Sequence, residues 1–408
     1  MPEGRALHSF LPVAPSGDLG KKVPSENLMK VLLVGDHPPP YGGVSVHVEV
    51  VHQAVRAQGG ICKVLDVGKG QLPADGVVPA TGYLDCAAKL ARYAMRGYRL
   101  HVHTSGANPK SWMLAAACAA AGKLSPRPPI VTFHSGLGPE WLSADPIRAK
   151  IACAVASSFG NVIAVSDEIR ATLIACGVSR ERIEVLSAFS RSFLHPGTPP
   201  HGLREVREEA APLYCAMLAP GPVYGQEALL RAFRLVHARN PRARLVVYGP
   251  GTELMGAEVA RVCGSAASAV QAFGEVHRGA ALALIAGCDV FVRPTLADGD
   301  SVSVREAVAL GRAVVATSVG TRPPQARLVP PGDADALAAA LMDATHEPAL
   351  RVAPPPEEAA KTDCLRRLLE LYSDGAAAPS GAPVAKPKTA GKIGTQVETP
   401  ACAASAAS

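Results

Sequence analysis

Short runs of apolar residues alternate with segments of helical spacing along most of this chain. Residues 29–35 read MKVLLVG and predict a buried strand. A helical pattern follows over residues 44–57, with Val46 and Val50 on its apolar face. A glycine pair ends that pattern, and residues 61–67 predict a second strand. This strand–helix–strand order is typical of a parallel sheet covered by helices.

The same alternation continues through the rest of the sequence. The further strands that it predicts span residues 100–104, 130–134, 161–165, 183–186, 213–218, 243–248, 270–273, 289–292 and 313–316. Segments rich in alanine and leucine, such as residues 226–238 and 334–342, predict helices between them. A chain of 408 residues exceeds one usual core, so we predict an α/β fold with two Rossmann-like domains.

Changes in composition suggest where these domains begin and end. We predict a disordered leader over residues 1–28 and a disordered tail over 375–408, because neither has apolar periodicity. The first domain is expected at 29–195, followed by a linker at 196–208 that mixes proline, glycine and charge. The second domain is expected at 209–353, and an amphipathic helix over 354–374 follows it.

Composition narrows the possible partners. The formal net charge is +6, but we find no dense basic face with interleaved aromatic residues, so we expect no nucleic-acid partner. The ten cysteines form no C-x-x-C pair, which indicates free thiols and no metal site. No signal peptide is evident, and the longest apolar run, residues 113–121, is too short to span a bilayer. We expect a cytoplasmic protein, with at most weak peripheral contact at the inner face of a membrane.

Residues 288–317, CDVFVRPTLADGDSVSVREAVALGRAVVAT, combine a strand, a polar loop, a helix and another strand. Asp298 lies in the predicted loop, and Glu306 lies inside the predicted helix. Ligands of open parallel sheets bind beyond the carboxyl ends of the strands. The backbone N–H groups of residues 301–303 at the helix start would favour an anion such as phosphate.

This stretch resembles the E-x7-E region of retaining glycosyltransferases of the GT-B architecture, family 4 type. In that family, E-G-x-x-x-x-x-x-E-A precedes G-x-P-V-V-A-T; residues 298–307 and 311–317 are similar, with Asp298 in place of the first glutamate. The P-P-Y-G-G loop at residues 39–43 resembles the first loop of the same enzymes. The resemblance spans residues 29–374 and implies two Rossmann-like domains facing across a cleft. The first would be the acceptor-side domain and the second the nucleotide-sugar-binding domain.

The resemblance also implies roles for individual residues. His134, at a strand end, would contact the donor sugar or its diphosphate; Asp298 would face the sugar hydroxyls; Glu306 would accept the ribose hydroxyls. Other donor-binding residues that we expect are Gly42, Gly43, Gly249, Phe273, Gly299, Ser301 and Val302. Ordinary turn chemistry for the glycine pair, a solvated acid pair and a strand-capping His134 are the alternative interpretations. We interpret His101 and His103 as structural.

One departure from the family concerns charge. The family follows the first strand of its second domain with G-R-L-x-x-x-K-G, whose arginine and lysine neutralise the diphosphate. Here Met217 and Tyr224 stand in those two places. Neutral side chains cannot replace two full charges in a partly desolvated site. We hypothesise that Arg293 substitutes, because it follows a predicted strand, with Arg305 and Arg322 as alternatives.

The resemblance therefore implies transfer of a sugar from a UDP- or GDP-sugar to a polysaccharide, a glycolipid or another carbohydrate or lipid-linked acceptor. Configuration would be retained, and no metal or other cofactor would be needed. The alternative is a GT-B pseudoenzyme, a nucleotide- or partner-binding subunit that lost turnover along with the basic pair. A Rossmann dehydrogenase is disfavoured because the chain has no G-x-G-x-x-G fingerprint after a predicted strand.

Overall fold

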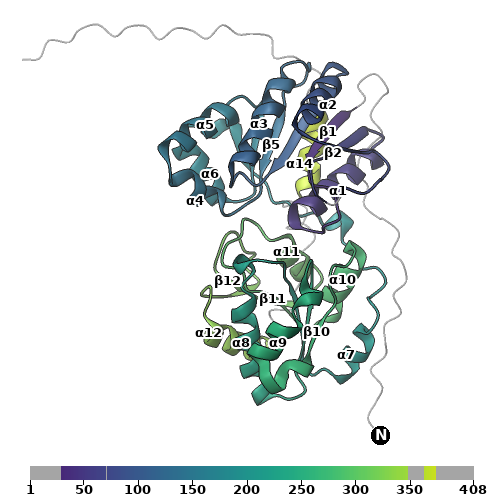
Figure 1. Ribbon diagram of the computed structural model, residues 1–408, viewed down its shortest axis with the longest axis vertical. Coiled ribbons are helices and arrows are strands. Elements are labelled where there is room, and N and C mark those ends of the chain that lie inside the picture. Colours follow the sequence, from purple (N-terminus) through teal and green to yellow (C-terminus); the bar gives the residue numbers. More distant parts are fainter. Residues whose placement is uncertain (1–28, 70, 348–362, 374–408) are drawn as a thin grey trace, which may run out of the picture. The chain divides into compact units, whose positions relative to one another are not determined.

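The computed structural model describes residues 29–69, 71–347 and 363–373, and it contains two parallel sheets with helices between their strands (Figure 1). The first sheet has seven strands in the order β3-β2-β1-β4-β5-β6-β7. Its elements are β1 (Lys30–Gly35), α1 (Gly43–Ala57), β2 (Ile61–Asp66), β3 (Val77–Pro79), α2 (Tyr83–Met95), β4 (Arg99–Thr104), α3 (Pro109–Gly122), β5 (Ile130–Phe133), α4 (Gly138–Ser143), α5 (Pro146–Ala156), β6 (Asn161–Ala164), α6 (Asp167–Ala175) and β7 (Ile183–Val185).

The second sheet has six strands in the order β10-β9-β8-β11-β12-β13. Its elements are α7 (Leu203–Glu209), β8 (Leu213–Met217), α8 (Gln226–Arg239), β9 (Arg244–Tyr248), α9 (Gly256–Cys263), β10 (Val270–Ala272), α10 (Arg278–Gly287), β11 (Val290–Arg293), α11 (Val302–Ala309), β12 (Ala313–Thr317), β13 (Ala326–Val329) and α12 (Ala334–Ala344). The chain order of the strands reverses between β1 and β4 in one sheet and between β8 and β11 in the other. Such reversals open a crevice for ligands at the carboxyl ends of the strands.

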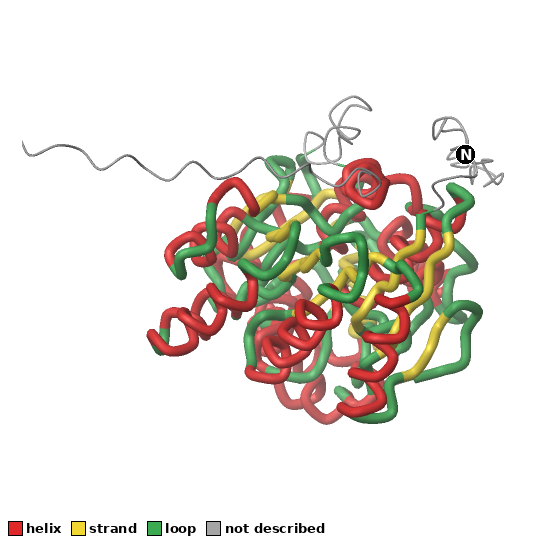
Figure 2. Tube along the Cα trace, turned by 90° about the horizontal axis from the view of Figure 1, so that it is seen from above, coloured by secondary structure: helices red, strands yellow, loops and turns green. Residues whose placement is uncertain are grey.

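The central strands are buried on both faces, as expected for parallel sheets covered by helices (Figure 2). In β1, Leu32 and Val34 pack in the cluster that includes Leu90 of α2 and Trp112 of α3. The alternate residues Val31 and Leu33 pack in another cluster with α1 and α14 (Cys364–Ser373). This alternation explains why the strand is a continuous apolar run in the sequence.

The last described helix, α14, lies beside β1 and α1 (Figure 1). Leu368 is buried there, and the Tyr372 hydroxyl lies 2.5 Å from Nδ1 of His101 on β4. Arg367 Nε donates to Glu184 of β7 at 2.8 Å. This segment therefore contributes to the core of the first sheet, although it follows the second sheet in sequence.

The predicted strands, including the edge strands β7 and β10, are confirmed to within about two residues, whereas two other edge strands, β3 and β13, were not predicted. Both are short and only partly buried, so they lack the apolar run of a central strand. Part of the predicted linker is helical, because Leu203 is buried at the start of α7 and Arg204 pairs with Glu208 one turn on, at 2.9 Å. The predicted leader, tail and first residues of the last helix, 354–362, lie outside the described residues.

The described helices include none that is both long and apolar enough to cross a membrane.

Candidate functional site

A cavity of about 460 Å³ opens where the loops after several strands meet. It is lined by the loop between β1 and α1, by residues 134–137 after β5, and by residues after β8. The β11–α11 loop and the start of α10 complete the lining. Its volume lies in the range of small-molecule sites, and its position matches the two reversals of strand order.

Nearly all the residues predicted for the site border this cavity. Those that line it are Gly42, Gly43, His134, Gly249, Arg293, Asp298, Gly299, Ser301, Val302 and Glu306. Phe273 is outside this lining and packs, partly buried, against the core of the second sheet. The fold therefore brings the predicted residues together from both sheets, while their contacts with a donor stay a prediction.

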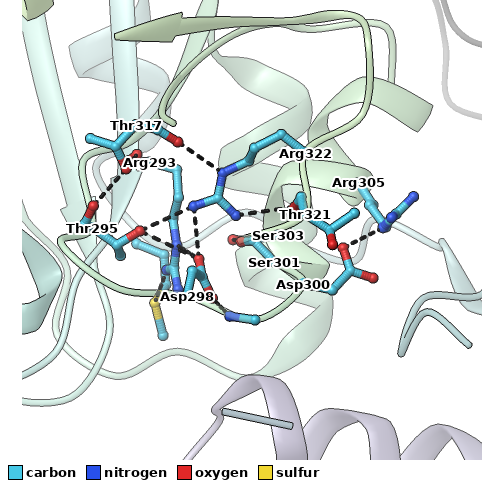
Figure 3. Close-up of polar contacts among 12 residues, drawn as sticks. Arg293, Thr295, Asp298, Asp300, Ser301, Ser303, Arg305, Thr317, Thr321 and Arg322 are labelled. Carbon is cyan, nitrogen blue, oxygen red and sulfur yellow. Dashed lines mark hydrogen bonds and ion pairs between the residues drawn. The ribbon is translucent and has the colours of Figure 1, made fainter. Parts of the chain in front are cut away.

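Asp298 is held by two arginines (Figure 3). Its Oδ2 accepts from Arg293 Nε at 3.1 Å and from Arg322 Nη2 at 3.2 Å, and its Oδ1 accepts from the Gly299 N–H at 3.1 Å. Burial alone would raise the pKa of Asp298, but the two guanidiniums hold it below its ordinary value. The carboxylate is thus ionised and contacts both arginines, and its contact with sugar hydroxyls, which the resemblance implies, stays a prediction.

Arg293 lies between the two residues that replace the family's basic pair. Its Nη1 is 3.4 Å from Sδ of Met217, and its guanidinium carbon is 5.6 Å from the centre of the Tyr224 ring. Arg293, Met217 and Tyr224 all line the cavity. The Arg293 guanidinium therefore places a positive charge beside the two positions that carry an arginine and a lysine in the family that the sequence resembles.

The other two arginines considered from the sequence do not line the cavity. Arg322 is 3% exposed and also donates to the Thr295 hydroxyl and the Thr317 carbonyl, so it fixes the loop around Asp298 (Figure 3). Arg305 Nε donates to Asp300 Oδ1 at 2.6 Å. Burial raises the pKa of Asp300 above its ordinary value despite this partner. Both arginines act as anchors of the acidic loop.

Glu306 is paired with Arg278, which was not predicted as a site residue. Arg278 Nη1 lies 2.7 Å from Glu306 Oε1, and the two side chains are 17% and 8% exposed. Burial raises the pKa of Glu306, and Arg278 lowers it only in part. In the structure Arg278 is the first residue of α10, where the helix dipole disfavours a cation unless an anion is nearby.

His134, partly exposed at the cavity wall, adjoins three buried histidines, His47, His101 and His103. Nε2 of His134 lies 3.2 Å from Nδ1 of His103, and the His101 and His103 rings are 4.1 Å apart. Burial holds the pKa of His134 well below its ordinary value, so its ring is neutral near pH 7. His134 can therefore exchange hydrogen bonds at the cavity wall, but it supplies no charge there. His103, interpreted as structural, is its direct neighbour.

Comparison with known families agrees with this geometry. The family described as "Glycosyltransferase Family 4" matches residues 41–188, and "Glycosyl transferases group 1" matches residues 211–347. Together the two matches cover more than half of the chain. The chain belongs to the GT-B glycosyltransferases.

Solved structures show the same fold at low sequence identity. HepE from Anabaena, solved with UDP-glucose, is 17% identical with a TM-score of 0.64, over 84% of this chain and 98% of HepE. Sucrose-phosphate synthase from Thermosynechococcus elongatus is 16% identical with a TM-score of 0.64, over 85% of this chain and 98% of the synthase. A glycosyltransferase from Rickettsia africae ESF-5 is 16% identical with a TM-score of 0.60, over 85% and 98% of the two chains. No protein of curated function matches this chain in sequence.

Glycines allow two loops of this glycosyltransferase to meet at the cavity wall. A Cβ on Gly299 would lie 2.4 Å from the His134 carbonyl oxygen, and a Cβ on Gly136 would lie 2.0 Å from the Asp298 carbonyl oxygen. Real Cβ atoms essentially never come this close to backbone atoms. The loop that carries Asp298 therefore packs directly on the loop that carries His134.

The described part of the glycosyltransferase contains no group of three or more histidine, cysteine or acidic side chains arranged to hold a metal ion.

Proposed function

We propose that this glycosyltransferase moves a sugar from a nucleotide-diphosphate sugar to a carbohydrate or lipid-linked acceptor, with retention of configuration. The observation that carries the proposal is the position of Arg293 on the cavity wall, between Met217 and Tyr224. Arg293 would place a cation beside the diphosphate in a site that lacks the arginine and lysine of the family. UDP-sugars are the first donors to test, because the similar structure of HepE was solved with UDP-glucose.

The charges around Asp298 support this role for Arg293. Two guanidiniums, those of Arg293 and Arg322, share one carboxylate, so this group of three carries one net positive charge. Arg322 is buried, and Arg293 lines the cavity. A unit charge 4 Å from a phosphate oxygen is worth about 4 kcal/mol at the effective dielectric constant of a protein surface. The surplus charge is therefore large enough to matter for a leaving diphosphate.

The backbone at the start of α1 would supply further phosphate contacts. The first N–H groups of a helix have no partner inside the helix, and the dipole there favours an anion. The first turn of α1 has no acidic residue, and a Cβ on Gly43 would meet nothing within 4 Å. The Tyr41 N–H, just before α1, donates to the anionic Glu275 Oε1 at 2.7 Å.

Retention is supported by the resemblance and by the state of the buried carboxylates. An inverting transfer needs a free general base beside the acceptor hydroxyl. Of the acidic residues that line the cavity, Asp298, Asp300 and Glu306 are each paired with at least one arginine, and Glu275 accepts a hydrogen bond from the Tyr41 N–H. In the proposed reaction the acceptor oxygen bonds to the anomeric carbon, the bond to the diphosphate breaks, and the acceptor proton passes to the departing phosphate oxygen.

Calorimetric titration of the full chain with UDP and GDP tests the donor site. Arg293→Met should weaken binding of the preferred nucleotide about 10- to 100-fold, or about 1.4–2.7 kcal/mol. The fold should survive, because Asp298 keeps Arg322 as a partner. Arg231→Met, on the exposed surface of α8, is the matched control. Equal affinity of Arg293→Met and the control would count against the proposal, as would a wild-type chain that binds neither nucleotide.

Turnover is the second part of the test. Transfer or hydrolysis of UDP-glucose and other donors would be followed by nucleotide release, and the anomeric configuration of the product by NMR. An α-linked product from an α-donor supports retention. Nucleotide binding without turnover across donors and acceptors would favour the pseudoenzyme instead.

A further inference from the structure

Two arginines, Arg278 and Arg293, line the cavity in the described part of the chain, and no lysine does. Arg293 carries the proposed function. Arg278 comes from another element, the first residue of α10, and is 17% exposed in its side chain. Besides its ion pair with Glu306, its Nη2 lies 3.4 Å from the Phe193 carbonyl oxygen. Arg278 is thus a second, partly exposed cation at the edge of the same cavity.

The Arg278–Glu306 pair occupies groups that a donor would need. A carboxylate that accepts ribose hydroxyls must offer its oxygens to the ligand, yet Oε1 of Glu306 faces Arg278 at 2.7 Å. Removing either partner alone would leave a buried charge without compensation, which is costly. Binding can open the pair cheaply only if the ligand supplies a partner to both residues at once. A nucleoside diphosphate does this, because it carries hydroxyls and anionic oxygens in one molecule.

We propose that Arg278 is a second diphosphate-binding residue and that the donor replaces the Arg278–Glu306 ion pair with two contacts. Glu306 accepts the ribose hydroxyls, and Arg278 donates to a phosphate oxygen. This inference rests on the proposed function. It gives the cavity two phosphate-binding cations, Arg278 and Arg293, where Met217 and Tyr224 leave none. Arg305 and Arg322 are excluded from this role because they lie behind the lining, bound to Asp300 and Asp298.

If the ligand replaces the Arg278–Glu306 ion pair in this exchange, the affinity of a uridine nucleotide should increase with its number of phosphates. Uridine can engage Glu306 only by leaving Arg278 without an anion, so it should bind weakly. UMP and UDP return an anion to Arg278 and should bind progressively more tightly. In Arg278→Met the competing cation is gone, so uridine has no ion pair to break, while the diphosphate loses one of its partners.

Calorimetric titrations of uridine, UMP and UDP into the wild type, Arg278→Met and Arg204→Met test the exchange. Arg204 is 81% exposed on α7 and serves as the matched control. We expect Arg278→Met to bind UDP at least about tenfold more weakly, or about 1.4 kcal/mol, and uridine equally or more tightly. Arg204→Met should match the wild type for all three ligands.

Several outcomes separate this inference from the proposed function. A wild type that binds UDP, with an Arg278→Met variant that binds it equally well, overturns the role of Arg278 alone. Equal losses for uridine and UDP also overturn it, because they indicate a structural role. A wild type that binds no nucleoside diphosphate overturns the donor site itself. Glu306→Gln is the second variant should Arg278→Met not fold: it should weaken uridine binding, whereas unchanged uridine affinity contradicts the exchange.

Discussion

The arginines at the cavity wall work in combination with carboxylates. Asp298 joins Arg293 to Arg322, Glu306 faces Arg278, and Asp300 holds Arg305. Each pair lies mostly out of water, where an isolated charge is expensive. The charges at the cavity wall are therefore compensated by one another, and in the proposed exchange a ligand would replace the internal partner.

Asp298→Asn should destabilise the protein markedly. The substitution preserves the shape of the side chain but leaves the guanidiniums of Arg293 and Arg322 without their shared anion. Loss of one member of a buried ion pair typically costs about 3–5 kcal/mol, so the urea midpoint should fall clearly. Asp75→Asn, which breaks an exposed pair with Arg56, is the control and should not change the midpoint measurably. Equal midpoints for the two variants would contradict the account of Asp298.

The sequence predicted the members of this site better than their partners. Two features stand out in the sequence because each follows an apolar strand: the glycine pair at residues 42–43, and Asp298 and Glu306 at the spacing of the E-x7-E motif. Arg278 does not, because its partner is 28 positions away and only the folding of α10 beside α11 brings the two together. The orientation of Asp298 toward arginines also depends on Arg322, which follows the next strand. Ion pairs of this kind depend on tertiary packing and leave no periodic pattern in the sequence.

At the scale of elements, the start of α1 is open to the cavity. Gly42 and Gly43 line it, and neither α1 nor its N-cap residue provides an acidic side chain there. A glycine at the beginning of a helix is not required by backbone conformation when its φ is negative. A glycine in this position is explained if phosphate oxygens approach the backbone closely.

Gly43→Ala separates folding from binding. The added methyl group would meet no atom within 4 Å, so stability should be unchanged or slightly higher. Donor affinity should fall about tenfold, because the methyl group would occupy the approach of the phosphate to the backbone. Gly256→Ala in α9, also without an atom within 4 Å of the new Cβ, is the control. UDP affinity in Gly43→Ala equal to that of the control would exclude a phosphate contact at this glycine.

The histidine group links three elements of the first sheet: His47 on α1, His101 and His103 on β4, and His134 after β5. Burial lowers the pKa of His47 to about 4, with a further lowering by nearby Arg278, although the Ala188 carbonyl acts in the opposite direction. The pKa values of His101 and His103 are also well below the ordinary value, mainly through burial. The imidazole rings of His47, His101 and His103 are therefore neutral in the folded protein near pH 7.

Stability should therefore fall as the pH is lowered from 6.5 toward 4. In this window the unfolded chain binds protons that the folded chain excludes, so the free energy of unfolding decreases by up to about 1.4 kcal/mol per histidine per pH unit. Asp300 and Glu306 have raised pKa values and offset part of this loss at the acid end. Urea unfolding at pH 7.5, 6.5 and 5.5 measures the effect. A free energy of unfolding that is constant over this range would contradict the prediction, because it would show that the histidines bind protons equally in the folded and the unfolded chain.

At the scale of the whole molecule, the sequence predicted the two-sheet α/β fold because central parallel strands are continuous apolar runs. It missed the edge strands β3 and β13, which are short and partly exposed, although it predicted β7 and β10, which are also short edge strands. The helix α7, which lies in the predicted linker, was not predicted because Leu203 is its one buried residue and most of its other residues are charged. The exact limits of the two domains stay a prediction.

We propose that Arg293 and Glu306, on the wall of one cavity, receive the diphosphate and the ribose of a donor. A crystal structure of the chain with UDP tests this assignment most directly. We predict phosphate oxygens within hydrogen-bonding distance of the Arg293 guanidinium and ribose hydroxyls on the Glu306 carboxylate. UDP bound outside this cavity, or with its phosphates away from Arg293, would contradict the account.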